Sequence, residues 1–142
     1  MSRIFWDTNL FIYLLEGADE HARQVVQLRR AMLERGDQLL TSALTLGEVL
    51  VKPIELDADE LRRKYEEVIT STATIIPFDE KAAASYARLR LDRSLRPPDA
   101  IQLACAGAAG VDLFITNDAR LQSKRVPGIQ FIVPLDRAPL LP

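Results

Sequence analysis

The sequence has very few of the residues that most often hold metals or form disulfides. Cys105 is the only cysteine and His21 the only histidine among its 142 residues. A single cysteine excludes an internal disulfide and a cysteine-based zinc site. A mechanism that depends on histidine would have to use His21 alone. We therefore expect any chemistry of this chain to come from other residue types.

Long apolar runs and a strong net charge are also missing. The longest stretch without a charged residue spans residues 100–111, which is 12 residues, whereas a membrane helix needs about 20 apolar residues. The 18 basic residues nearly balance the 20 acidic ones, giving a net charge of −2. This balance argues against a protein that coats nucleic acid through bulk positive charge. We expect a soluble, cytoplasmic protein that does not act at a membrane.

Short apolar runs alternate with helical stretches along the chain, a pattern typical of βαβ units. The expected strands cover residues 3–6, 38–41, 73–78, 113–116 and 129–133, and the expected helices cover residues 10–15, 20–35, 45–52, 57–69, 79–95 and 98–109. Pro53 is expected to end the third helix, and Asp57 or Asp59 to cap the fourth. The sequence therefore predicts a single three-layer α/β/α domain over residues 1–142, with a central parallel sheet of about five strands.

Four carboxylates fall close to the expected ends of strands and starts of helices. Asp7 ends the first strand and Asp118 follows the fourth. Glu48 lies on the helix after the second strand, and Asp99 opens the helix that leads into the fourth. In parallel sheets, ligands bind outside the carboxyl ends of the strands, where the strand order reverses. If the first and fourth strands are neighbours, the four acids come together at that point.

Each of these acids also has a purely structural explanation. Asp7 and Asp118 stand where helix N-caps belong, and Asp99 suits the first turn of a helix. Glu48 precedes Lys52 by four residues, the spacing of a helical ion pair. However, the apolar neighbours of Glu48 and Asp99 predict buried surroundings, where a charge needs a partner. Converging carboxylates repel one another unless a cation lies between them, and hard divalent cations bind oxygen ligands.

Four short segments carry these acids, and their order along the chain is informative. They are Trp6-Asp7-Thr8-Asn9, Thr45–Val49, Arg96-Pro97-Pro98-Asp99-Ala100 and Ile115-Thr116-Asn117-Asp118. Together they resemble the motifs of PIN-domain nucleases, most of all the VapC-type toxins of bacterial toxin–antitoxin pairs. One departure is Leu121, where many toxins of this type carry a further acidic residue.

The resemblance implies a PIN fold and a metal-dependent endoribonuclease that uses Mg²⁺ or Mn²⁺. It implies a catalytic set that also binds the metal, made of Asp7, Glu48, Asp99 and Asp118. It further implies that Asn9 and Thr116 help to order the site. As partners it implies an RNA substrate, a cognate antitoxin protein and a second copy of the chain in a homodimer.

This chemistry suits a chain with so few nucleophilic side chains. A bound divalent cation lowers the pKa of water and offsets charge on phosphate oxygens, so hydrolysis needs no histidine. The basic residues are 14 arginines and 4 lysines. Arg96 is the candidate for holding the RNA backbone, because a guanidinium matches phosphate; an ion pair with Asp92 or Asp99 is the competing interpretation. Without the four acids, 16 acidic residues face 18 basic ones, so the excess acidity lies where a cation would neutralise it.

Three other functions remain open at this stage. A haloacid-dehalogenase-like phosphatase also has an aspartate after its first strand, but that pattern requires a second aspartate where this chain has Asn9. A non-catalytic PIN-fold binding module would act through partners alone. A PIN nuclease in RNA processing would share the chemistry of a toxin but not its biological role.

Overall fold

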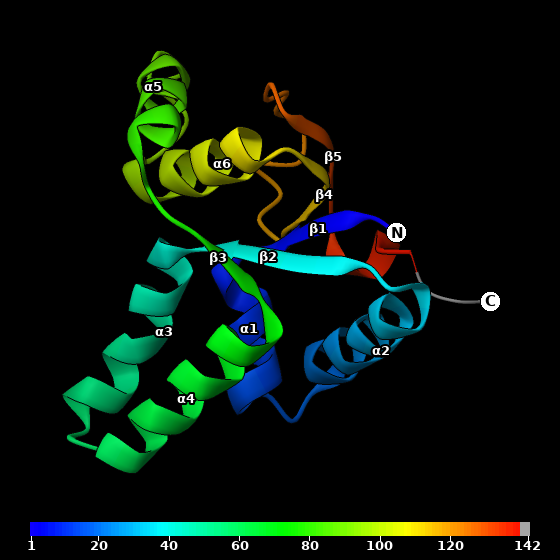
Figure 1. Ribbon diagram of the computed structural model, residues 1–142, viewed down its shortest axis with the longest axis vertical. Coiled ribbons are helices and arrows are strands. Elements are labelled where there is room, and N and C mark those ends of the chain that lie inside the picture. Colours follow the sequence, from blue (N-terminus) through cyan, green and yellow to red (C-terminus); the bar gives the residue numbers. More distant parts are fainter. Residues whose placement is uncertain (140–142) are drawn as a thin grey trace.

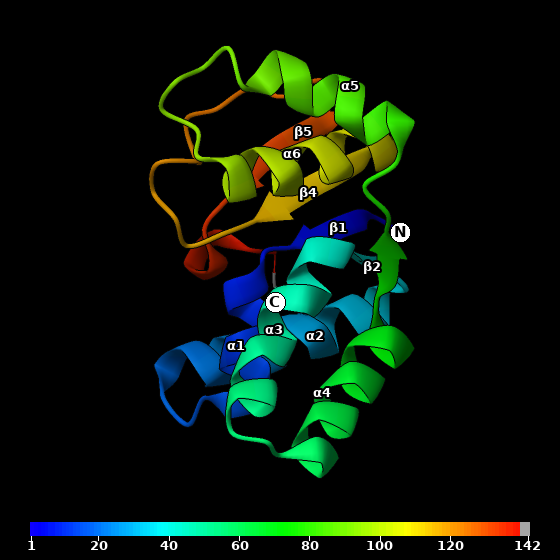
Figure 2. The same cartoon turned by 90° about the vertical axis from the view of Figure 1, so that its left-hand side faces the viewer.

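The computed structural model describes residues 1–139, in which a parallel sheet is covered by helices on both faces (Figures 1 and 2). The strands are β1 (Arg3–Trp6), β2 (Gln38–Ser42), β3 (Thr74–Ile76), β4 (Val111–Ile115) and β5 (Ile129–Val133). The helices are α1 (Thr8–Glu16), α2 (Glu20–Arg35), α3 (Ala43–Glu55), α4 (Asp59–Thr72), α5 (Glu80–Leu89), α6 (Pro97–Ala109) and the 3₁₀ helix η1 (Leu135–Arg137). The predicted α/β class and five-stranded parallel sheet are confirmed.

The order of the strands decides where a ligand site can form. The sheet order is β3-β2-β1-β4-β5, and every pair is parallel. β1 is the central strand, with Phe5 beside Leu40 of β2 and beside Phe114 of β4. From the central strand β1, the chain adds β2 and then β3 on one side of the sheet. It then adds β4 and β5 on the other side. The order therefore reverses at β1, and the crevice of a parallel sheet lies at the carboxyl ends of β1 and β4.

Two hydrophobic cores hold the layers together, one on each face of the sheet. Because successive strand side chains point to opposite faces, Ile4 and Trp6 enter the core shared with α1, α2 and α4. Phe5 enters the other core, where it stacks on Phe114 with ring centroids 4.9 Å apart and packs with Leu103 of α6. All five of these side chains are fully buried. The alternating side chains of β1 thus pack against the helices on both faces of the sheet, and this packing holds both helical layers next to the end of the strand.

Predictions about the ends of three helices are wrong. The helix expected over residues 79–95 ends at Leu89, and turns and bends follow it up to residue 95. Pro53 does not end its helix, because α3 continues to Glu55 with Pro53 inside it and buried. The missing proline N–H falls in the last turn, and the bond from the Leu56 N–H to the Lys52 carbonyl continues the turn beyond it. The N-cap of α4 is Ala58, with no side-chain cap, so neither Asp57 nor Asp59 caps that helix. Within residues 1–139, no helix combines the length and apolar character of a membrane span.

Candidate metal centre

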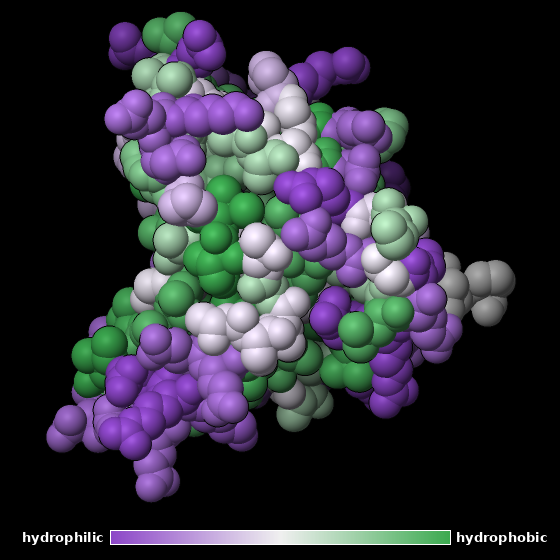
Figure 3. Space-filling model, in the orientation of Figure 1, coloured by the Kyte–Doolittle hydropathy of each residue, from purple (hydrophilic) through white to green (hydrophobic). Residues whose placement is uncertain are grey.

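A pocket of about 480 Å³ lies where the strand order reverses, between the starts of α1 and α6 and the first half of α3. It is lined by Asp7, Thr8, Asn9, Ile12, Glu48, Arg96, Pro98, Asp99, Gln102 and Asp118. The space-filling view is hollowed on the side where the lobe of α5 and α6 faces the lobe of α3 and α4 (Figure 3). A larger hollow of about 650 Å³ beside β5 has no carboxylate in its lining. All four predicted acids therefore line one pocket.

Asp7 leaves β1 and caps α1, so its carboxylate is fixed by the backbone. One oxygen, Oδ1, accepts from the Thr8 N–H at 2.7 Å, and Oδ2 accepts from the Thr116 hydroxyl at 2.7 Å. Burial raises the pKa of Asp7, and the nearby charges of Glu48 and Asp99 raise it further, against the two hydrogen bonds that lower it. The charged form is therefore disfavoured at this place, and a cation in the pocket would offset that cost.

Glu48 reaches the pocket from α3 and is held by a neutral hydroxyl. Thr8 donates to Glu48 Oε1 over 2.7 Å. The alternative helical ion pair does not form, because Lys52 lies 3.5 Å from Glu16 instead. The expected buried surroundings are also wrong: Glu48 is exposed, since its neighbour Val49 supplies the face of α3 that enters the core.

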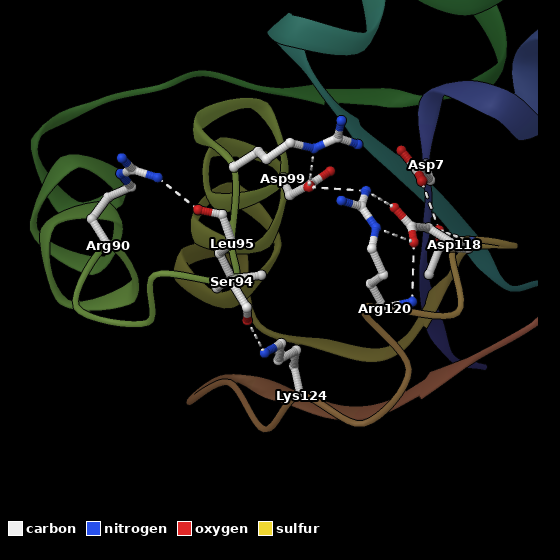
Figure 4. A network of polar contacts seen from close by, with 10 residues as sticks. Asp7, Arg90, Ser94, Leu95, Asp99, Asp118, Arg120 and Lys124 are labelled. Carbon is white, nitrogen blue, oxygen red and sulfur yellow. Dashed lines mark hydrogen bonds and ion pairs between the residues drawn. The ribbon is translucent and has the colours of Figure 1, made fainter.

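Asp99 and Asp118 lie on the other side of the pocket, and arginine holds both. Arg120 donates from Nε to Asp118 Oδ1 at 3.0 Å, and its terminal nitrogen lies 3.5 Å from Asp99. Figure 4 shows this guanidinium between the two carboxylates, with Asp7 above Asp118 in the view. The hydrogen bond from Arg120 is the main cause that lowers the pKa of Asp118. Arg96 approaches the same cluster, with Nε 3.6 Å from Asp99 Oδ2.

Comparison with known proteins agrees with this arrangement. The PIN domain family profile matches residues 4–127. This chain belongs to the PIN domain family. No curated protein sequence matches it significantly.

Several solved structures have the same fold, and their superpositions cover most of this chain. A DNA-bound VapBC from Salmonella typhimurium superposes with a TM-score of 0.72 at 24% identity, covering 95% of this chain and 99% of that one. A toxin–antitoxin complex from Klebsiella pneumoniae gives 0.62 at 28% identity, covering 89% and 94%. VapC20 from Mycobacterium tuberculosis, described as a sarcin-ricin loop cleaving toxin, gives 0.60 at 13% identity, covering 78% and 86%. The predicted resemblance to VapC-type PIN domains is confirmed.

The supporting residues predicted from the sequence behave differently from one another. Thr116 donates to Asp7 and accepts from the Asp118 N–H at 3.0 Å, so one hydroxyl links two of the acids. Asn9 lines the pocket and is exposed.

Arg96, the predicted substrate-binding residue, has 68% of its side chain exposed while pairing with Asp99. It is thus both ion-paired and accessible to a ligand.

The donor set of this PIN domain fits a hard divalent cation. All four acids offer carboxylate oxygens, the ligands that Mg²⁺ and Mn²⁺ prefer. Within residues 1–139 no lysine or arginine forms an ion pair with Asp7 or Glu48. In the same residues, no three such side chains are close enough to form a ready metal cage. The guanidinium of Arg120 contacts both Asp99 and Asp118.

Two residues of the site, Arg120 and Gln102, were not predicted from the sequence. The structure also explains why Leu121 stands where many similar toxins carry an acidic residue. Arg120 follows Asp118 by two residues in a loop, a spacing that carries no signal by itself. Gln102 is a polar residue within the apolar helix α6, which is a signal, because a buried amide must be hydrogen-bonded. Leu121 is 2% exposed and packs in the second core, so its apolar character serves the fold.

Proposed function

We propose that this protein is a metal-dependent endoribonuclease that hydrolyses RNA phosphodiester bonds as the toxin of a toxin–antitoxin pair. The observation that carries the proposal is a single pocket at the reversal point of the sheet, lined by Asp7, Glu48, Asp99 and Asp118. Membership of the PIN domain family, a family of nucleases, supports nucleic acid hydrolysis. The fold shared with a sarcin-ricin loop cleaving toxin supports RNA as the substrate.

The four acids are the residues that would hold Mg²⁺ or Mn²⁺. A divalent cation held there supplies an activated water and offsets charge on the phosphate. The protein's own contribution is to fix the carboxylates: Thr116 orients Asp7, and Thr8 orients Glu48. This pre-organisation matters because acids that are already oriented need not be ordered again when the cation binds.

We propose that two arginine side chains at the edge of the pocket hold the RNA backbone. Arg96 and Arg120 both reach Asp99, and about half or more of each side chain is exposed. A guanidinium that is itself exposed can turn from a carboxylate to a phosphate, which accepts two parallel N–H bonds. We assign Arg96 to substrate binding on this basis.

The activity is tested by cleavage of defined RNAs by the wild type and by Asp7→Asn, each with Mg²⁺ and with a chelator. Asparagine keeps the helix cap at position 7, so the variant is expected to fold, as circular dichroism will verify, and to lose Mg²⁺-dependent cleavage. Full activity in Asp7→Asn, or equal cleavage with the chelator present, contradicts the proposal.

The toxin role implies two protein partners, a cognate antitoxin and a second copy of the chain. Support comes from similar structures that are toxin–antitoxin complexes, among them those from Salmonella typhimurium and Klebsiella pneumoniae. Expression of the wild type is expected to stop growth, and co-expression of a small protein encoded by the neighbouring gene to restore it and to co-purify. Growth arrest that no neighbouring gene relieves favours a PIN nuclease in RNA processing.

A further inference from the structure

Gln102 is a buried amide beside the acidic pocket whose role the proposed chemistry leaves unexplained. It lies on α6 one turn after Asp99, is 4% exposed, and contributes to the pocket lining. Its amide nitrogen donates to the Thr8 hydroxyl at 2.9 Å and to the Thr45 hydroxyl at 2.8 Å. Its amide oxygen accepts from the Ser42 hydroxyl at 2.5 Å. One side chain thus joins α6 to α1, to α3 and to the end of β2.

The chemistry of these groups gives the hydrogen bonds a direction. An amide NH₂ only donates, so the Thr8 and Thr45 oxygens must accept from Gln102, and each must send its own proton elsewhere. The Thr8 proton goes to Glu48 Oε1, 2.7 Å away. The Thr45 hydroxyl lies 3.1 Å from that of Thr8, which has a second lone pair free to accept from it. The hydrogen bonds therefore form a chain with one direction: Ser42 donates to Gln102, Gln102 donates to Thr8, and Thr8 donates to the Glu48 carboxylate.

Burial makes this arrangement hard to change. Ser42 and Thr45 are completely buried and Thr8 is 8% exposed, so water has little access to replace a lost partner. A buried polar group left without a partner is costly, because it has given up its hydrogen bonds to water and gained none in return. Glu48, in contrast, is exposed and would otherwise be free to take several rotamers in water. Among the described side chains, the Thr8 hydroxyl is the only donor to Glu48. Gln102 determines the direction in which this hydroxyl donates, because its amide N–H occupies the Thr8 oxygen as an acceptor.

We propose that Gln102 is a positioning residue that fixes the Glu48 carboxylate through Thr8 and thereby sets the affinity of the pocket for a divalent cation. This inference rests on the proposed function, because it takes the pocket to be a metal site. Residues that orient metal ligands through a hydrogen bond commonly change metal affinity by about 10- to 100-fold when they are removed.

A double-mutant cycle on the full chain, with Mn²⁺ affinity measured by calorimetry, tests the role of Gln102. Gln102→Leu is expected to weaken Mn²⁺ binding about 10-fold. In a Glu48→Gln background the same change is expected to have almost no further effect, because the carboxylate that Gln102 positions is gone. Gln130→Leu, at an exposed position of β5, is the matched control and leaves the affinity unchanged.

A second pair of variants keeps the inference testable if Gln102→Leu does not fold. Thr8→Val keeps the shape of the side chain but removes the donor to Glu48, and is expected to weaken Mn²⁺ binding to a similar extent. Thr8→Ser restores the hydroxyl and is expected to restore the affinity.

The outcomes separate this inference from the function on which it rests. Wild-type binding that Gln102→Leu and Thr8→Val leave unchanged overturns the positioning role alone. A loss that is equally large in the Glu48→Gln background also overturns it, because Gln102 would then act on the fold in general. Absence of Mn²⁺ binding in the wild type contradicts the proposed metal site itself.

Discussion

The four acids of the pocket form two pairs that are held in opposite ways. Asp7 and Glu48, the hydroxyl-held pair, accept hydrogen bonds from Thr116 and Thr8, which carry no charge. Asp99 and Asp118, here called the arginine-held pair, lie against the guanidinium of Arg120. The first pair is ordered but its charge is not neutralised, whereas the charge of the second pair already has a cation beside it.

This difference indicates what each pair contributes. A carboxylate whose pKa is raised by burial, as that of Asp7 is, gains most from a metal ion. A carboxylate that is already paired with arginine gains less stabilisation from a metal ion. When a metal binds, the arginine must move away or share the carboxylate with the metal. We therefore propose that the hydroxyl-held pair anchors the cation of the proposed function and that the arginine-held pair adjusts its affinity.

The largest expected effect comes from removing a charge of the hydroxyl-held pair. Glu48→Gln keeps the size of the side chain and its hydrogen bond from Thr8, but is expected to lower Mg²⁺-dependent RNA cleavage by about 100-fold or more. Glu55→Gln, at an exposed position near the end of the same helix, is the matched control and keeps wild-type activity. If the two variants cleave RNA at the same rate, the hydroxyl-held pair does not anchor the cation.

A smaller effect of opposite sign is expected from the arginine-held pair. Arg120→Gln removes a positive charge that competes with the metal, so Mn²⁺ affinity measured by calorimetry at low salt is expected to rise about 30-fold, the effect of a unit charge about 4 Å from a divalent cation in water. The gain shrinks at high salt because the Arg120 side chain is about half exposed and salt screens its charge. Arg125→Gln, in the same loop region, serves as control. An affinity that falls in Arg120→Gln would assign this arginine to holding the pair in place.

The smallest effect concerns stability in the presence of a chelator. Because the pKa of Asp7 is raised from its ordinary value of 3.8, the folded protein binds this proton more tightly than the unfolded chain does. Stability is therefore lost as the pH rises from 3.8 through the raised pKa. Asp7→Asn avoids this loss, so it is expected to melt above the wild type at neutral pH, with the difference vanishing towards pH 3.8.

The control for this stability difference is Asp79→Asn, which changes the exposed N-cap of α5 and is expected to show no such gain. Added Mg²⁺ is expected to reverse the order, since the wild type then gains binding energy. A melting temperature of Asp7→Asn below that of the wild type in chelator at neutral pH would contradict the cost assigned to Asp7.

The sequence carries enough information to predict the acids but not the contacts that hold them. Asp7 and Asp118 follow strands, so a parallel sheet with β1 beside β4 is sufficient to bring them together. The contacts of Arg120 with Asp99 and of Gln102 with Thr8 join residues 21 and 94 positions apart. Such pairs depend on how loops and helices pack, which no local pattern encodes. Pro53 illustrates the same limit, because it lies buried inside the last turn of α3 instead of ending the helix.

The most direct test of the central claim is a crystal structure of the protein soaked with Mn²⁺, with anomalous scattering recorded to locate the metal. The account predicts an anomalous peak within ligand distance of the Asp7 carboxylate in the wild type, and its loss in Asp7→Asn crystals. A peak that lies only elsewhere on the surface, or one that persists unchanged in Asp7→Asn, would contradict the claim that the hydroxyl-held pair anchors the cation.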